Sequence, residues 1–113
     1  MRFYFLDGAP ELDIEENKLL LSNFLGGDIQ GCNYTVNMNI DMCNKVKKGE
    51  LPEWEGTGNA FTVYIKPDGV LLYNEYTEAE CQLSSVEEFE WYLTQWKRLL
   101  DTREELIIDS PYD

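Results

Sequence analysis

The clearest pattern in the chain is a pair of alternating segments on either side of a turn. Residues 59–65 and 70–76 flank the sequence Lys66-Pro67-Asp68-Gly69. Proline fixes φ for the first central position of a turn and glycine accepts a positive φ, so this sequence predicts a β-hairpin. If Lys66 pairs with Val70, the face toward the core carries Phe61, Val63, Ile65, Leu71 and Tyr73. The opposite face then carries residues that suit either partial cover or a partner: Thr62, Tyr64, Leu72, Asn74 and Tyr76.

A long amphipathic helix is predicted to begin near Ser84 or Ser85. Each of these serines precedes a glutamate by three residues, which is the capping-box pattern, and Glu87 and Glu88 fall in the first turn. Apolar residues then recur at steps of three and four, with two more beside them: Val86, Phe89, Leu93, Trp96 and Leu100, flanked by Tyr92 and Leu99. Trp91 falls opposite this stripe among glutamates, so we expect an exposed ring that can anchor a partner.

The segment Cys32–Met42 alternates between apolar and polar residues at every step, which favours a half-buried strand. Part of the same segment also fits helical spacing, at Val36, Ile40 and Cys43. We therefore expect the strand to give way to a helix near Asp41, and that helix to end at Gly49.

The first third of the chain is less well determined by its pattern. Residues 2–6 indicate a short strand, followed by a turn over residues 7–10. Residues 13–25 predict a capped helix that Gly26-Gly27 stops, whereas residues 18–24 taken alone also fit a strand. The pattern alone therefore leaves the structure of residues 11–45 open.

These elements predict one α+β domain over residues 1–113, a small mainly antiparallel sheet with the C-terminal amphipathic helix packed across it. A chain of 113 residues, 43% of them hydrophobic, is long enough for one core of ordinary size. We expect the end of the chain, from about residue 108, to fray. No apolar run approaches the roughly 20 residues that cross a bilayer, and the start is too soon acidic for a secretory signal. We therefore expect a cytoplasmic protein that does not bind membranes.

Charge changes the picture from fold to function. The chain has 22 Asp and Glu against 9 Lys and Arg, no histidine, and a net charge of -13. Between Gly49 and Gln95 the only basic residue is Lys66. Such a field attracts basic surfaces and repels nucleic acid, so we expect a charged protein partner and no direct binding of nucleic acid. The simpler interpretation is a face that only keeps the protein soluble.

The composition argues against most catalytic and cofactor chemistry. Without histidine, a Ser or Cys triad is excluded in its usual form, and three cysteines with no paired spacing predict reduced thiols rather than a zinc site. Residues 56–59 lack the lysine of a phosphate loop. Asn37, Asn39 and Asp41 lack the glycine and final glutamate of a calcium loop. We therefore expect no enzymatic activity, metal or cofactor, although carboxylate pairs near Glu75 leave a glycosidase-like enzyme as a weaker alternative.

Surface recognition is the interpretation that remains. Trp54 lies between two glutamates, and Tyr73 and Tyr76 lie around Glu75. Aromatic rings surrounded by acids suit a basic partner, because the rings supply contact area while the carboxylates speed encounter and pair with Lys or Arg. For Trp54 the competing interpretation is simple packing against the hairpin. The predicted partner-binding residues are Glu53, Trp54, Glu55, Asp68, Glu75, Tyr76, Glu78, Glu80, Glu87 and Trp91.

Part of the chain resembles a known class of proteins. The residues concerned are 54–63 (WEGTGNAFTV) leading into the hairpin, then 68–70, 74–76, 87–89, Trp96 and 99–100. They resemble the small bacterial immunity proteins of polymorphic-toxin and contact-dependent growth inhibition systems, over about residues 46–100. The resemblance implies a non-enzymatic inhibitor that binds the C-terminal domain of its cognate toxin, which we expect to be a basic nuclease. No set of binding residues comes with it.

The charge suggests the same function independently, because an acidic protein can occupy the basic groove in which a nuclease holds phosphates. The alternative is an acidic mimic of nucleic acid that inhibits host DNA-binding enzymes, which requires an extended and regularly spaced negative surface. A third interpretation, a carboxylate enzyme or a binder of small molecules, requires a deep pocket that holds an acid with a raised pKa.

Overall fold

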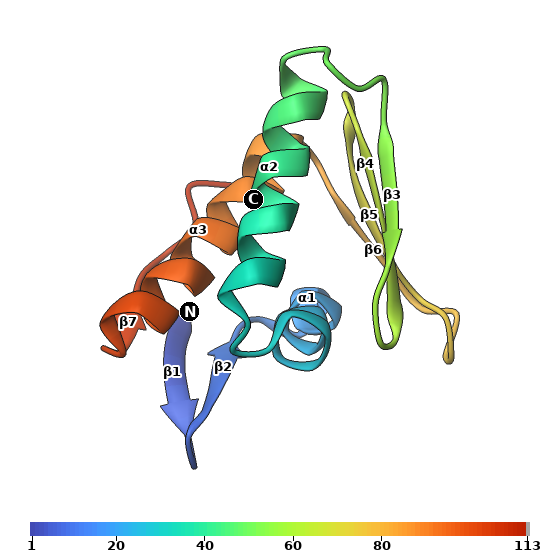
Figure 1. Ribbon diagram of the computed structural model, residues 1–113. Coiled ribbons are helices and arrows are strands. Elements are labelled where there is room, and N and C mark those ends of the chain that lie inside the picture. The colour runs from blue at the N-terminus through green and yellow to red at the C-terminus, as the bar shows by residue number, and fades with distance from the viewer. Residues whose placement is uncertain (113) are drawn as a thin grey trace.

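The computed structural model of the protein describes residues 1–112 (Figure 1). Its elements follow one another as β1 (Arg2–Leu6), β2 (Ala9–Asp13), the short 3-10 helix η1 (Glu16–Lys18), α1 (Leu19–Phe24), the π-helix η2 (Leu25–Ile29), α2 (Asn33–Lys47), β3 (Trp54–Thr57), β4 (Phe61–Lys66), β5 (Gly69–Asn74), β6 (Glu80–Leu83), α3 (Val86–Thr102) and β7 (Leu106–Ile107). Asp113, the last residue of the end predicted to fray, lies outside the described residues.

The strands form two antiparallel sheets with the helices between them (Figure 1). The larger sheet has the order β3-β4-β5-β6, and the smaller one has the order β2-β1-β7. The helices α1, α2 and α3 cover one face of the larger sheet, which we call the inner face. The predicted α+β fold with a C-terminal helix across an antiparallel sheet is therefore confirmed, with a second sheet added. None of the helices in residues 1–112 combines the length and apolar character needed to cross a membrane.

The hairpin forms where it was predicted, but its register was wrong by one residue. Lys66 pairs with Gly69 rather than Val70, so the turn has only two residues and Val63 lies opposite Leu72. A side chain is not tolerated at Gly69, because a Cβ there would lie 2.8 Å from the Leu83 carbonyl oxygen of β6. A slip of one residue moves every side chain of a strand to the other face. The inner face of β5 therefore carries Val70 and Leu72, both 0% exposed, in place of Leu71 and Tyr73.

The segment predicted as a strand from Cys32 is helical from Asn33 onward as part of α2, so that prediction was wrong. Its buried residues follow helical steps of three and four, at Val36, Asn39, Cys43 and Val46. The apolar residues that supported the strand are divided by the helix between its inside and its outside, and Tyr34 is 79% exposed. The predicted helix end is close to the observed one, since α2 ends at Lys47 and Gly49 has φ of 77°.

In the first third of the chain, helical structure covers residues 16–29 instead of the predicted 13–25, and only residues 19–24 of it are α-helix. Residues 9–13 pair with β1 as a strand, which confirms the strand over residues 2–6 and shortens the turn to Asp7 and Gly8. Helical structure then begins at Glu16 and continues through Gly26 and Gly27 to Ile29, so the two glycines do not end it. The strand considered for residues 18–24 does not form.

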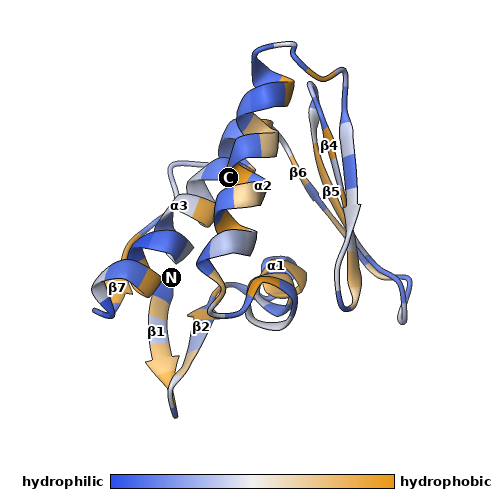
Figure 2. Cartoon of the chain, viewed as in Figure 1, coloured by the Kyte–Doolittle hydropathy of each residue, from blue (hydrophilic) through white to orange (hydrophobic). Residues whose placement is uncertain are grey.

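Helix α3 begins at the predicted cap and buries the predicted stripe. The Ser85 hydroxyl accepts a hydrogen bond from the backbone N–H of Glu88 at 3.0 Å. All the predicted stripe residues are at most 8% exposed, and Trp96 also donates its indole N–H to the Gln30 carbonyl oxygen at 2.8 Å. In Figure 2 hydrophobic residues run along α1, β4 and β5, where they meet this stripe in the core. The apolar side of α3 therefore has a structural role, as part of the hydrophobic core.

A buried ion pair ties the start of α3 to the first third of the chain. The Glu88 carboxylate accepts hydrogen bonds from the Ser84 N–H and hydroxyl, both at 2.9 Å, and from the Lys18 ammonium at 3.3 Å. Only 3% of the Glu88 side chain and 13% of the Lys18 side chain are exposed. The Lys18 pKa is raised, because hydrogen bonds and charge interactions with Tyr92 and Glu88 together outweigh desolvation, which lowers it. Glu88 is therefore a structural carboxylate.

We predict that Glu88→Ala lowers the free energy of unfolding by about 3 kcal/mol in urea titrations, because it leaves the Lys18 ammonium without its buried partner. The control is Asp101→Ala, which breaks the ion pair Lys97–Asp101 on the surface of the same helix, where the side chains are 38% and 50% exposed. That change should cost less than about 1 kcal/mol. Equal losses in the two variants would show that the buried pair is not the stronger link.

Candidate functional site

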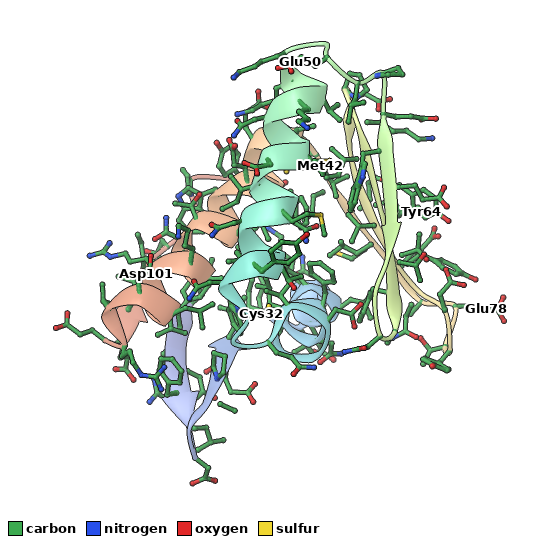
Figure 3. All side chains as sticks on the ribbon, in the orientation of Figure 1. Cys32, Met42, Glu50, Tyr64, Glu78 and Asp101 are labelled. Atoms are coloured by element: carbon green, nitrogen blue, oxygen red, sulfur yellow. The ribbon has the colours of Figure 1, made fainter. Side chains whose placement is uncertain are left out.

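The face of the larger sheet turned away from the helices is the candidate site, and we call it the outer face. Its side chains stand in two rows across the four strands. One row consists of Glu55, Tyr64, Leu71 and Gln82, and the other of Thr57, Thr62, Tyr73 and Glu80. No described helix or strand lies over this face, and Figure 3 shows Tyr64 pointing away from the helices. The outer face is therefore available to a partner.

Four carboxylates surround the two tyrosines of the outer face. Partial burial raises the pKa of Tyr64, as do the nearby Glu55 and Glu75 carboxylates. Partial burial likewise raises the pKa of Tyr73, followed by the effects of Glu78, Glu75 and Glu80. Since Glu75 acts on both phenols, the two rings share one negative environment. We call this set the acidic face; it consists of Glu55, Tyr64, Tyr73, Glu75, Glu78 and Glu80.

A chain of hydroxyl groups fixes the central carboxylate of the acidic face. The Thr62 hydroxyl donates to Glu75 Oε2 at 2.5 Å, and Thr57 Oγ1 lies 2.9 Å from Thr62 Oγ1. Because a hydroxyl has one hydrogen to donate, Thr57 is the donor to Thr62. A carboxylate that accepts such a hydrogen bond has a fixed position, so a partner meets a preformed negative group.

The turn between β5 and β6 carries the rest of the acidic face and is internally bonded. The Asn74 side-chain oxygen accepts hydrogen bonds from the N–H groups of Tyr76 and Thr77, at 2.9 and 3.0 Å. Glu78 has φ of 63° at the tip of the turn, where Figure 3 shows its side chain projecting into solvent. Tyr76 is 79% exposed. The predicted residues Glu75, Tyr76, Glu78 and Glu80 are therefore brought together.

The opposite end of the outer face is less negative. A hollow of about 440 Å³ is lined there by Tyr64, Lys66, Asp68, Gly69, Leu71 and Gln82. Lys66 lies beside Asp68 in the turn and 3.9 Å from the carboxylate of Glu53. Glu53 and Asp68 therefore share this end of the sheet with a base, whereas Glu75, Glu78 and Glu80 lie at the other end near Tyr73.

Three of the predicted partner-binding residues do not lie on the outer face. Trp54 pairs with Ile65 across β3 and β4, so its ring lies on the inner face, where it is half-buried against the core. Glu87 and Trp91 belong to α3, on the other side of the sheet. Glu87 is exposed, whereas Trp91 is half-buried, with its ring 5.2 Å from that of Tyr92. The prediction of an exposed Trp91 was wrong, because the ring packs against the core and edge-on to the ring of Tyr92.

The predicted register missed Leu71 and Tyr73 as residues of the outer face, because its longer loop assigned them to the core. It left open whether Tyr64 is covered or available to a partner. The turn sequence fits either loop length, and the observed register is selected by the close contact of Gly69 with Leu83 of β6. Among residues 1–112, no three Cys, Asp or Glu side chains are grouped closely enough to hold a metal ion.

We predict that the phenols of Tyr64 and Tyr73 titrate above the ordinary pKa of 10.0 and respond to different carboxylates. Glu55→Gln should lower the pKa of Tyr64 alone, Glu78→Gln that of Tyr73 alone, and Glu75→Gln both, as followed by NMR of the tyrosine ring carbons. Because the folded chain holds these protons more tightly than the unfolded chain, the free energy of unfolding should fall as the pH rises from about 10. Identical responses of both rings to Glu55→Gln and Glu78→Gln would contradict this arrangement.

Comparisons with known proteins found no matching family model, no matching curated protein and no matching solved structure. The resemblance to immunity proteins is neither supported nor contradicted by a relative, and it stays a prediction. A function for this chain therefore rests on its own residues.

Proposed function

We propose that the protein is an immunity protein, which binds and neutralises the C-terminal domain of a cognate toxin through the acidic face. The toxin domain in this proposal is a basic nuclease, and the protein acts by occupying its substrate-binding surface. The observation that carries the proposal is the grouping of four carboxylates around two tyrosines on a sheet face that no described helix or strand covers. The interpretation of the acids as a solubilising face predicts no such grouping.

The acidic face is chemically suited to contact a partner surface that normally binds phosphates. Lysine and arginine side chains in a nuclease groove pair with carboxylates as they pair with phosphate oxygens. The net charge of -13 speeds the encounter over long distances, and the tyrosines supply contact area once the surfaces meet. Tyr76, 79% exposed beside this face, adds a third ring.

The arrangement of the acids favours this function over mimicry of nucleic acid. A mimic presents negative charge at regular spacing over an extended surface. Here Glu75, Glu78 and Glu80 gather near Tyr73 at one end of the outer face, whereas Glu53 and Asp68 lie at the other end with Lys66. Further exposed acids, such as Glu87, lie on α3 behind the sheet. A single patch mixed with aromatic rings is typical of a surface for one partner protein.

We predict that the purified protein binds the basic toxin domain encoded beside its own gene in a 1:1 complex that survives moderate salt. The triple variant Glu55→Lys, Glu78→Lys and Glu80→Lys should weaken the affinity by about a hundredfold, mainly through slower association and lost ion pairs, as measured by surface plasmon resonance. It should also abolish protection of cells that express the toxin.

The matched control is Asp41→Lys, Glu16→Lys and Glu104→Lys, which makes the same change of net charge at exposed positions off the outer face. Affinity should change by less than about tenfold in that variant. Equal losses would show that net charge alone drives binding and that the acidic face is not the site. No association with the toxin domain, together with inhibition of several unrelated DNA-binding enzymes, would replace the proposal with the nucleic-acid mimic.

A further inference from the structure

A pocket of about 180 Å³ lies on the other side of the larger sheet, between its edge strand and the helices. Residues of α2 form one wall, β3 and β4 form the opposite wall, and η2 closes the end. Most of the lining is apolar or aromatic; the full set is Phe24, Asp28, Ile29, Thr35, Met38, Asn39, Trp54, Gly56, Thr57, Gly58, Phe61 and Val63. None of the residues that define the acidic face belongs to this pocket.

The pocket wall contains a buried polar atom without a protein partner. Asn39 is 3% exposed and donates its side-chain N–H to the Thr35 carbonyl oxygen at 2.9 Å. Its Oδ1 atom accepts no hydrogen bond from any residue in the described part of the chain. A buried acceptor without a donor is costly, and the other buried residues on this helix are Val36, Cys43 and Val46. An apolar residue at position 39 would give the fold a higher stability than an asparagine with an unpaired oxygen. The presence of the amide therefore indicates a ligand.

The charged residue that lines the pocket, Asp28, is also an acceptor. The Asp28 carboxylate receives the backbone N–H groups of Ala60 and Phe61, both at 3.0 Å, and these bonds hold its position. No lysine or arginine lines the pocket, whereas the rings of Phe24, Trp54 and Phe61 do. Acceptor oxygens together with aromatic rings in a protein of net charge -13 favour a donor that carries a positive charge.

The Trp54 ring lies close against the backbone of its own strand, β3. Together the ring and the strand form the wall of the pocket opposite α2. A Cβ on Gly56 would lie 2.1 Å from an atom of the Trp54 ring, so the indole lies directly against the backbone two residues further along β3. A Cβ on Gly58 would lie 2.6 Å from Asp28 Oδ2. Both glycines therefore allow the ring and the carboxylate to lie close to the strand.

We propose that this pocket binds a single alkylammonium group. The volume of about 180 Å³ corresponds to about six water molecules at roughly 30 Å³ each, which suits a stem of about four methylene groups with an ammonium end. The stem packs against the rings, and the ammonium donates to Asn39 Oδ1 after small movements of the side chains that cover this buried oxygen. Either the lysine side chain of a partner protein or a free alkyl amine supplies this chemistry, and only the first source rests on the proposed function.

The test is an NMR titration of the ¹⁵N-labelled protein with n-butylammonium, n-butanol and butyrate. Butylammonium should shift the side-chain amide of Asn39 and the indole N–H of Trp54, and it should bind at least tenfold more tightly than the alcohol or the acid. Equal binding of butanol would overturn the assignment of a cation. No shift at Asn39 or Trp54 with any probe would overturn the site and leave water as its occupant.

The decisive variant is Asn39→Leu, which removes the acceptor while keeping the size of the side chain. It should weaken butylammonium binding at least tenfold without lowering the midpoint of urea unfolding, whereas the control Asn37→Leu, at an exposed position of the same helix, should leave binding unchanged. Unchanged binding in Asn39→Leu would overturn the proposal. Should that variant not fold, Met38→Trp blocks the pocket from a half-buried position on α2 and should abolish binding.

A second ligand distinguishes the two sources. If Nα-acetyl-lysine N-methylamide binds as tightly as butylammonium, the pocket admits a lysine that is part of a chain, and a partner protein is the source. If only butylammonium binds, a free amine is the source. A negative amine titration leaves the charge-reversal experiment on the acidic face unaffected, so the two proposals fail separately.

Discussion

The two-residue turn at Pro67-Asp68 decides which side chains this protein buries and which it presents. Side chains alternate along a strand, so the pairing of Lys66 with Gly69 directs Val70 and Leu72 into the core opposite Ile65 and Val63. The same pairing places Leu71 and Tyr73 on the outer face. Because Leu83 of β6 approaches Gly69 too closely for a side chain, the neighbouring strand enforces this register. The hydrophobic core and the acidic face are thus two results of one turn.

Three polar links add to the hydrophobic core that holds the helices on the inner face. The Asp28 carboxylate joins η2 to the start of β4, the Trp96 indole joins α3 to the chain after η2, and the Lys18–Glu88 pair joins the start of α3 to η1. Each link includes a buried or half-buried polar group that finds a partner within the protein. The carboxylates of the acidic face differ, because Glu55, Glu75, Glu78 and Glu80 all belong to exposed residues, whereas Glu88 is buried.

The sequence predicts α3 and the hairpin strands well because their signals are local. A serine cap, a stripe at helical spacing and a turn with proline and glycine act within a few residues. Local signals do not identify α2 as a helix, because its alternating apolar residues also fit a strand. Packing against α3 favours the helix. The hairpin register likewise depends on β6, which is distant in sequence. Of the predicted site, the acids of residues 75–80 come together as expected. Trp54 instead faces inward, because it lies opposite Ile65, whose side chain is in the core.

The acidic face and the pocket share an unfavourable feature in the isolated protein, and a positive partner relieves both. Partial burial, followed by the nearby carboxylates, raises the pKa of both Tyr64 and Tyr73, and none of the residues that define the acidic face is a base that could balance those carboxylates. The Asn39 oxygen is buried without a donor and adds no stability. Acidic and basic residues mixed on the outer face would make the folded protein more stable, and so would a leucine at position 39. A group that donates hydrogen bonds and carries positive charge compensates both arrangements, so both observations favour the proposed recognition of cationic side chains.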